Sequence, residues 1–214
     1  LVKDVSQQLP IFTLSEILGI PEEDRHKLAT WMEFLELAQY YAAENFKETS
    51  GKTEEMEVDT SMIELFQTMI DEMFDYGKHI LQAKRANPEN DLLSAIANAE
   101  LDGAKLSQEY LDGSWLLIIF AGNDTTRNSI SGAIKLLTEF PDQKNKLINN
   151  LELLPNFAQE TIRMVSPVIH MRRTTTCDTT IGNQKLGAGE KVIMWYGAAN
   201  RDPTVFDRPH EFDI

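Results

Sequence analysis

Apolar residues recur at steps of three and four positions along most of this chain, and this spacing places them on one face of a helix. The longest regular run starts at Ser61 and predicts a helix that ends before Asn87-Pro88. Its apolar side includes Met62, Leu65, Phe66, Met69, Ile70, Met73, Phe74, Gly77, Ile80 and Leu81. Shorter runs predict further helices at 9–18, 21–38, 91–99, 141–149 and 154–165.

The stretch 115–128 interrupts this regularity. An apolar run, Trp115 to Ala121, is followed by Gly122 and by four polar residues, and apolar helical sequence then resumes. Two interpretations fit. Asp124 could cap a new helix after Gly122 ends the old one. Alternatively, one helix at about 107–139 is opened at Gly122, and Asp124 and Thr125 face a cofactor. Because the run is apolar on every side, we expect it to be buried and Asp124 to lie deep in the protein.

The pattern changes after Pro167, where β-branched residues alternate with others. Segments 168–176, 179–181 and 191–194 predict short strands, with a tight turn at Gly182-Asn183. Segment 47–60 is polar, contains Gly51 and predicts an exposed loop. The expected fold class is therefore mainly α with a small β region (α+β).

Charge and composition exclude several classes of function. With 20 Lys and Arg against 34 Asp and Glu, the net charge of −14 disfavours binding to nucleic acid or to an anionic membrane surface. The apolar run at 115–121 is shorter than the roughly 20 residues that span a bilayer. Cys177 is the sole cysteine, so no intrachain disulfide can form, and with no secretory signal at the start we expect a cytoplasmic protein.

The histidines and the short motifs point to no metal or phosphate site. His26, His79 and His210 lie in polar segments and form no spaced ligand set. A glycine-rich phosphate loop and a G-x-S-x-G elbow are both absent from the sequence.

Three separated motifs carry a family resemblance. The first is the 121–126 segment AGNDTT, and the second is Glu160 with Arg163, three positions apart on one helical face. The third is the 199–203 segment ANRDP, followed by Phe206 and Pro209. Each is weak alone, and most Glu–Arg pairs at this spacing are surface pairs. In this order they resemble a cytochrome P-450, over nearly the whole chain, which implies one partial P-450 domain at 1–214 and haem b as cofactor.

The resemblance also implies roles for individual residues. Asp124 and Thr125 correspond to the catalytic acid–alcohol pair that delivers protons, Glu160 and Arg163 to a structural pair that supports the haem side of the fold, and Arg173 to the strand arginine that pairs with a haem propionate. His170 is expected at the haem edge or in simple packing. The other expected cofactor neighbours are Ala121, Gly122 and Thr126, and the expected substrate-pocket residues are Leu117, Phe120, Ala121, Val168 and Ile169.

The chain departs from the family at its ends. The family's cysteine ligand is expected beyond Ile214, together with the arginine that completes the Glu160–Arg163 network, and early helices and most of the main sheet are expected before Leu1. Cys177 is no substitute, because it lies at a strand end without a glycine-rich loop. We therefore expect a fragment truncated at both ends, without a metal ligand of its own and inactive alone.

Two functions remain open. The first is a haem-thiolate monooxygenase that inserts one oxygen atom from O2 into an apolar substrate, with electrons from a ferredoxin-type donor and its reductase. The segments AGNDTTRN and HMRRT are similar in sequence to those of the P-450 subgroup that acts on sterols, terpenoids and methyl-branched lipids. The alternative is a truncated, non-catalytic helical protein that binds a lipid or a protein partner; an unrelated helical bundle is a third possibility.

Overall fold

The computed structural model describes residues 2–49 and 60–214. It contains two compact units, Lys3–Asp124 and a second formed chiefly by Thr125–Ile214, and each is treated by itself below. The boundary falls within one helix, between Asp124 and Thr125. The expectation of a single domain stays a prediction.

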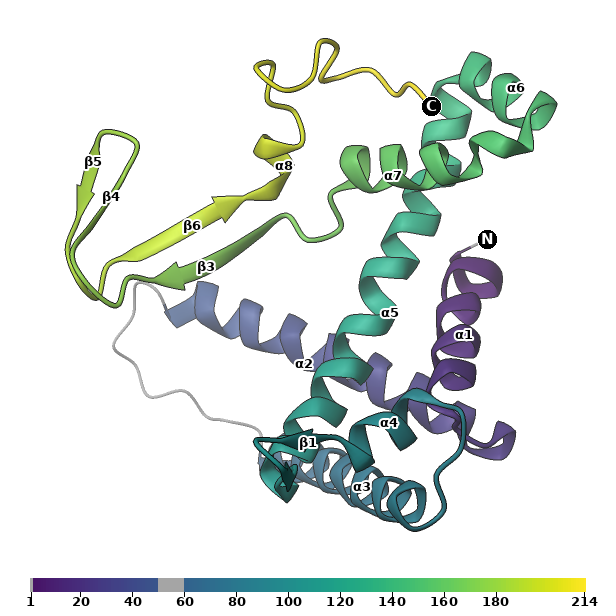
Figure 1. Cartoon of the computed structure of the whole chain (residues 1–214), viewed down its shortest axis with the longest axis vertical. Helices are drawn as coiled ribbons and strands as arrows, with labels where there is room; N and C mark the ends of the chain where they lie inside the picture. Colours follow the sequence, from purple (N-terminus) through teal and green to yellow (C-terminus); the bar gives the residue numbers. More distant parts are fainter. Residues whose placement is uncertain (1, 50–59) are drawn as a thin grey trace. The chain divides into compact units, whose positions relative to one another are not determined.

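The first unit is helical (Figure 1). Its elements are η1 (Val2–Ser6), α1 (Gln8–Leu18), η2 (Glu22–Asp24), α2 (Arg25–Thr49), α3 (Thr60–Ala86), α4 (Leu92–Asn98), the hairpin of β1 (Glu100–Leu101) and β2 (Ala104–Lys105), and the first half of α5 (Gln108–Glu139). The predicted helices are confirmed, and residues 100–105 form a small hairpin. Of the predicted loop 47–60, residues 47–49 and 60 are helical, whereas 50–59 lie outside the described residues.

Three aromatic side chains lie at the centre of the core of this unit. The rings of Trp31, Tyr76 and Trp115 come from α2, α3 and α5, with centroids 5.3–6.3 Å apart. Trp115 Nε1 donates to the Met73 carbonyl at 2.9 Å, and Tyr76 Oη donates to the carboxylate of Asp24 at 2.9 Å. These two bonds pair the polar atoms of large apolar rings, which therefore fix α3 against α5 and against the start of α2.

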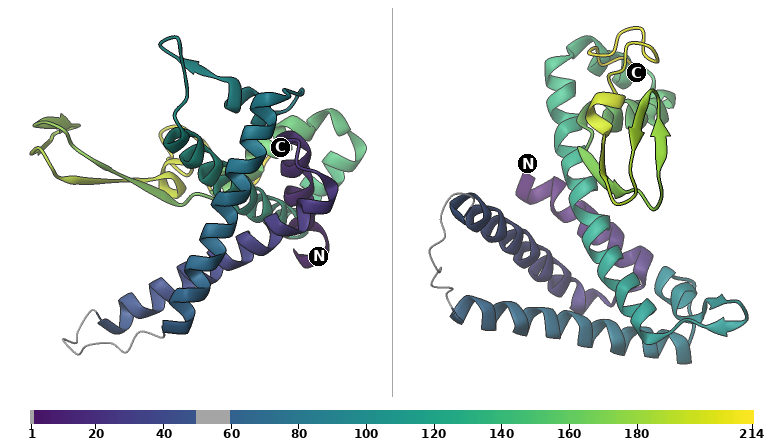
Figure 2. Two further views of the ribbon diagram at one scale, coloured as in Figure 1. Left: turned by 90° about the horizontal axis from the view of Figure 1, so that it is seen from below. Right: turned by 90° about the vertical axis from the view of Figure 1, so that its left-hand side faces the viewer.

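The second unit continues α5 and adds a small β region. Its elements are α6 (Pro141–Asn149), η3 (Leu151–Leu153), α7 (Leu154–Val165), β3 (His170–Thr174), β4 (Thr179–Ile181), β5 (Gln184–Leu186), β6 (Lys191–Trp195) and α8 (Tyr196–Ala199). Strands β3 and β6 pair antiparallel, and β4 and β5 form a hairpin beyond them (Figure 2). A separate core gathers Phe140, Phe157 and Phe212 around Leu136 and Leu147. The α+β expectation is thus confirmed.

The observed helix α5 rules out a new helix capped by Asp124. It also contradicts the expected opening at Gly122 and the expected burial of 115–121 on every side. Every residue from Gln108 to Glu139 is α-helical, so Asp124 does not cap a new helix, and Gly122 leaves no break in the helix. In the first half of α5, up to Asp124, only one face is buried, at Leu111, Trp115, Ile119 and Asn123, whereas Leu136 is buried in the core of the second unit.

The opposite side of α5 is open in this chain, and Asp124 is exposed. Leu117 and Phe120 are 65% and 48% exposed. The prediction of burial all round was wrong for a physical reason. Helices α1 and α3 cover one face only. The Leu14 side chain of α1 lies against Gly122, and Trp115 packs against the backbone of α3 at Gly77.

Two glycines of α5 give a matched test of how closely its second half packs against α7. A Cβ added at Gly132 would lie 2.3 Å from Val165 Cγ2 on α7, whereas one added at Gly113 meets nothing within 4 Å. We expect Gly132→Ala to lower the free energy of unfolding by about 1–3 kcal/mol, because the core is overpacked. Gly113→Ala should raise it by about 0.5–1 kcal/mol, because alanine restricts the unfolded chain. Denaturant titration of both variants measures the difference, and equal effects would contradict the close α5–α7 approach.

Candidate functional site

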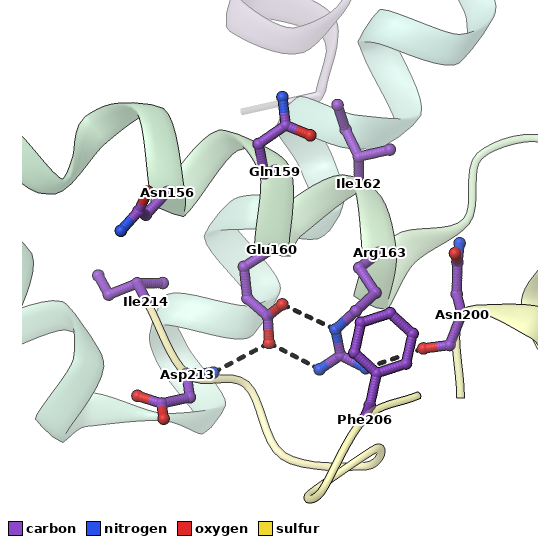
Figure 3. A pocket seen from close by; sticks show the side chains of 9 residues that line it. All are labelled: Asn156, Gln159, Glu160, Ile162, Arg163, Asn200, Phe206, Asp213 and Ile214. Atoms are coloured by element: carbon purple, nitrogen blue, oxygen red, sulfur yellow. Dashed lines mark hydrogen bonds and ion pairs between the residues drawn. The ribbon is translucent and has the colours of Figure 1, made fainter. Parts of the chain in front are cut away.

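Glu160 and Arg163 form a bidentate ion pair on α7, as the sequence predicted (Figure 3). Arg163 Nε donates to Glu160 Oε2 at 2.7 Å, and Arg163 Nη2 donates to Oε1 at 2.6 Å. The side chains of Arg163 and Glu160 are only 9% and 15% exposed, respectively. The pair is therefore no surface pair, and the planar fork of arginine matches the carboxylate in a way that lysine does not.

The remaining donors of Arg163 bind the segment 200–211. Nη1 donates to the carbonyls of Asn200 at 2.9 Å and Pro209 at 2.7 Å, and Nη2 also donates to the carbonyl of Glu211 at 2.7 Å. All five N–H groups of the guanidinium thus have acceptors. The Phe206 ring lies over it, 4.9 Å from Cζ to the ring centroid. Arg163 therefore holds an irregular segment to α7 through backbone atoms, a role that the residue types there did not indicate.

The same segment closes the C-terminus of α7. Ser166 has a positive φ of 46° and donates through Oγ to the Arg163 carbonyl at 3.0 Å. Asn200 Nδ2 donates to Ser166 Oγ at 3.0 Å, and Arg201 Nη2 donates to the Met164 carbonyl at 2.6 Å. These bonds satisfy carbonyls that a helix end otherwise leaves unpaired. The Asn200-Arg201 motif seen in the sequence thus has a structural role that sequence reasoning had not assigned.

An open groove of about 440 Å³ borders the ion pair. Figure 3 shows its lining, in which Asn156, Gln159 and Ile162 of α7 accompany Glu160, Arg163, Asn200, Phe206, Asp213 and Ile214. The Asp213 N–H donates to Glu160 Oε1 at 3.1 Å. Burial alone would raise the pKa of the Glu160 carboxyl, but the hydrogen bonds from Arg163 and from the Asp213 backbone outweigh burial and lower that pKa. The carboxylate is therefore stabilised in its charged form.

This lowered pKa predicts an acid-dependent loss of stability. A carboxyl whose pKa is lower in the folded than in the unfolded protein stabilises the fold above its ordinary value of about 4.3, and this contribution is lost as the pH falls through the folded pKa. We expect Glu160→Gln to be less stable than the unmodified protein at pH 7, with the difference shrinking as the medium is acidified. Unfolding free energies measured between neutral and acidic pH check this, and a difference independent of pH would refute it.

Asp124 and Thr125 are consecutive residues of α5, at the boundary between the two units. Thr125 is part-buried, and its carbonyl accepts a hydrogen bond from Ser129 Oγ at 2.8 Å. Positions 117, 121 and 124 are spaced by four and three residues, so Leu117, Ala121 and Asp124 share one side of the helix, with Phe120 beside them. The exposed side of α5 is thus apolar up to a carboxylate. Thr126 is also exposed, but it lies about 200° around the helix from Asp124.

Strand β3 separates two residues that were expected at one cofactor. Side chains alternate along a strand, so His170 and Arg172 lie on one face and Met171 and Arg173 on the other. His170 stacks on Trp195 of β6, with ring centroids 4.8 Å apart. The two predicted cofactor residues His170 and Arg173 therefore cannot approach one flat ligand from the same face. Alternation along a strand is itself a sequence signal and could have revealed this.

The remaining predicted pocket residues and the cysteine are at least partly exposed. Val168 is part-buried, and Ile169 is 61% exposed. Cys177 is exposed and forms no disulfide. Within residues 2–49 and 60–214, no cluster of His, Cys, Asp and Glu is arranged to hold a metal ion. No helix of the described chain combines the length and hydrophobicity needed to cross a membrane.

Comparisons with known proteins point to one family. A family model described as cytochrome P450 matches residues 143–214. Linalool 8-monooxygenase of Pseudomonas putida is 35% identical over 214 residues, which are all of this chain and 49% of that protein. The methyl-branched lipid omega-hydroxylase of Mycobacterium tuberculosis is 31% identical over 216 residues, 46% of its length. The chain thus spans about half the length of the curated relatives it matches.

Solved structures agree with these relatives. The structure of CYP109E1 from Bacillus megaterium in complex with corticosterone has a TM-score of 0.82 and 31% identity, and the match covers 99% of this chain and 53% of that one. A Mycobacterium marinum cytochrome P450, CYP268A2, in complex with pseudoionone matches 99% of this chain and 48% of its own with a TM-score of 0.80 at 33% identity.

Proposed function

We propose that this chain, which belongs to the cytochrome P450 family, forms part of a cytoplasmic haem monooxygenase. The reaction would insert one oxygen atom from O2 into an apolar substrate. The observation that carries this proposal is the exposed side of α5, where Leu117, Phe120 and Ala121 lead to Asp124, with the part-buried Thr125 as the next residue. An apolar wall beside a carboxylate and a hydroxyl suits proton delivery in a site that excludes water.

Haem iron is the cofactor of this family, and Arg173 offers a test of whether this chain suits it. The Arg173 guanidinium is exposed and, among the residues that the structure describes, bonds only to the Arg172 carbonyl at 2.9 Å and to Met171 Sδ at 3.9 Å. No carboxylate among the described residues pairs with it. A free guanidinium on a strand fits a propionate carboxylate. Arg173 would hold that group, and the haem iron would supply the chemistry that activates O2.

Each remaining residue would act without forming a bond to the substrate. Asp124 would take up protons from water, and the Thr125 hydroxyl would relay them by donating its own Oγ1 hydrogen toward the ligand while accepting another in its place. Ala121 carries only a small side chain and so would let a large flat ligand approach α5, whereas Gly122 faces Leu14 of α1 and would not border that ligand. Leu117, Phe120, Val168 and Ile169 would contact the apolar substrate and exclude water. Glu160 and Arg163 would keep the segment 200–213 in place.

The substrate class we propose is a terpenoid, a sterol or a methyl-branched lipid. This rests on the names of two relatives, a linalool 8-monooxygenase and a methyl-branched lipid omega-hydroxylase, and on the corticosterone and pseudoionone in the matched structures. The apolar exposed side of α5 is compatible with such ligands. Electrons would come from a ferredoxin-type donor with its reductase.

Labelled oxygen tests this function directly. The purified full-length protein would be incubated with a ferredoxin, its reductase, a panel of these lipids and ¹⁸O2, and the products analysed by mass spectrometry. The expected result is a hydroxylated product that carries one labelled oxygen atom. Product without label, or no product from any lipid despite full haem loading, would contradict the proposal.

The two neighbouring arginines of β3 give a matched prediction about cofactor retention. We expect Arg173→Ala to weaken haem binding by roughly 1.5–3 kcal/mol, about the strength of a hydrogen bond between charged groups. Arg172→Ala, on the opposite face of the strand, should retain haem like the unmodified protein. Haem transfer to an acceptor such as apomyoglobin measures both rates. Faster loss from Arg172→Ala than from Arg173→Ala would reverse the assignment.

A further inference from the structure

The tripeptide Leu-Asp-Gly occurs twice in this chain, in two different local structures. Leu101-Asp102-Gly103 belongs to the β1–β2 hairpin, and Leu111-Asp112-Gly113 lies in α5. An aspartate followed by glycine can react with its own backbone, because glycine has no Cβ to hinder the attack of its nitrogen on the preceding carboxyl. Since the two tripeptides are identical, a difference in their reactivity reports on the fold around them.

The first copy forms the exposed tip of the hairpin. Asp102 and Gly103 have positive φ angles of 53° and 78°, as a two-residue type I′ turn requires. Leu101 pairs with Ala104 across the turn, so the ladder bonds belong to these flanking residues and the Gly103 N–H lies outside the ladder. A Cβ placed on Gly103 would meet nothing within 4 Å. Within the described chain, nothing packs beside Gly103 that would hold its nitrogen away from the Asp102 carboxyl.

The hairpin is also too small to be rigid. Each strand has two residues, and all four of these residues are exposed. A two-stranded hairpin has little stability of its own, and regions with few buried apolar contacts open at a low cost in free energy. The turn can therefore adopt the backbone conformation that the reaction needs while the neighbouring helices stay folded.

The second copy is held in a conformation that prevents the reaction. In α5 the backbone N–H of Gly113 bonds to the carbonyl four residues earlier. The Asp112 carboxylate accepts a hydrogen bond from Gln108 Nε2 at 2.7 Å. Leu111 is 2% exposed and anchors this turn of the helix in the core, whereas Leu101 is 59% exposed. Attack on the Asp112 carboxyl therefore requires the helix to open first.

We propose that Asp102 is a site of spontaneous backbone modification, where aspartate is converted to isoaspartate. The Gly103 nitrogen bonds to Cγ of Asp102, and the carboxylic hydroxyl leaves as water together with the hydrogen of that nitrogen, which gives a succinimide ring. Water then opens the ring. Cleavage of the original peptide bond gives isoaspartate, and cleavage of the new bond restores aspartate. The reaction consumes no oxidant or cofactor and does not depend on the proposed monooxygenase activity.

Isoaspartate would alter the hairpin itself. The chain then runs through the side chain of residue 102, so one additional carbon atom enters the backbone of the turn. The register of β1 against β2, which pairs Glu100 with Lys105 and Leu101 with Ala104, depends on a turn of two residues. We therefore expect the modified protein to lose this pairing.

Peptide mapping after incubation in H2¹⁸O tests the proposal. The purified full-length protein is incubated at neutral pH, folded or in denaturant, and then digested in ordinary water. Each ring opening adds one ¹⁸O atom, and mass spectrometry locates the label and the isoaspartate. In the folded protein we expect both to form roughly tenfold or more faster at Asp102 than at Asp112, since about 1.4 kcal/mol of opening free energy corresponds to a factor of ten.

Denaturant should bring the two rates close together, because the tripeptides are identical. Equal rates in the folded protein, or a faster reaction at Asp112, would overturn the proposal. Asp102→Glu is the control variant, since glutamate would have to form a larger ring and reacts far more slowly. The label should therefore disappear from the hairpin peptide of Asp102→Glu, and label that persists there would show that Asp102 is not the reacting residue.

Discussion

Replacing Arg163 by alanine is expected to lower the free energy of unfolding of the full-length protein by about 3–5 kcal/mol, the cost of removing one partner of a buried ion pair. The substitution leaves the Glu160 carboxylate largely buried without its bidentate partner. It also frees the three carbonyls of Asn200, Pro209 and Glu211 that Arg163 holds. Denaturant titration with the m-value compared between proteins gives the difference.

Two further variants sharpen this result. Arg163→Lys keeps the charge but cannot form the five-donor fork, so it should retain only a minor part of the lost stability. Arg208→Ala is the control, because Arg208 is 59% exposed and pairs with Glu211 and Asp213 at the surface, where solvent screens ion pairs and they contribute little to stability. An Arg163→Ala protein no less stable than Arg208→Ala would show that the pair has no special role in the fold.

Thr125→Ala should separate electron consumption from product formation. If the hydroxyl holds the proton that the reaction needs, the product formed per electron donor consumed should fall by about tenfold or more, since positioned proton-transfer groups contribute on this scale or above. The unused electrons should appear as hydrogen peroxide. Product and peroxide, each measured against consumption of the electron donor, give the ratio.

A second threonine of the same helix is the control for this experiment. Thr138 is exposed, and its Oγ1 donates to the Ile134 carbonyl at 2.8 Å. Thr138→Ala should therefore leave the ratio of product to electron donor unchanged. If Thr125→Ala keeps the ratio of the unmodified protein, Thr125 has no role in proton delivery.

The periodic part of the fold could be predicted from the sequence, because regular spacing is a local property. The repeat at 61–81 became α3, and the 3-residue step from Glu160 to Arg163 became the ion pair on α7. The short strands β1, β2 and β5 were missed, since two or three residues carry too little alternation to recognise.

Features that depend on distant partners could not be predicted. Residues 115–121 are apolar on every side, yet Leu117 and Phe120 are exposed because exposure depends on which elements cover each face. Arg163 binds backbone carbonyls of 200–211, and carbonyls leave no mark in the residue types. The roles of Asp124, Thr125 and Arg173 came from the family resemblance and stay predictions.

The absorption spectrum of the reduced full-length protein under carbon monoxide tests whether this chain is part of a haem-thiolate protein. A haem held by a cysteine thiolate gives a strongly red-shifted Soret band under these conditions, whereas a histidine-ligated haem does not. We expect that band, with haem bound at one per protein and lost faster from Arg173→Ala. A protein that binds no haem, or one whose Soret band stays at the position of histidine-ligated haem, would contradict it.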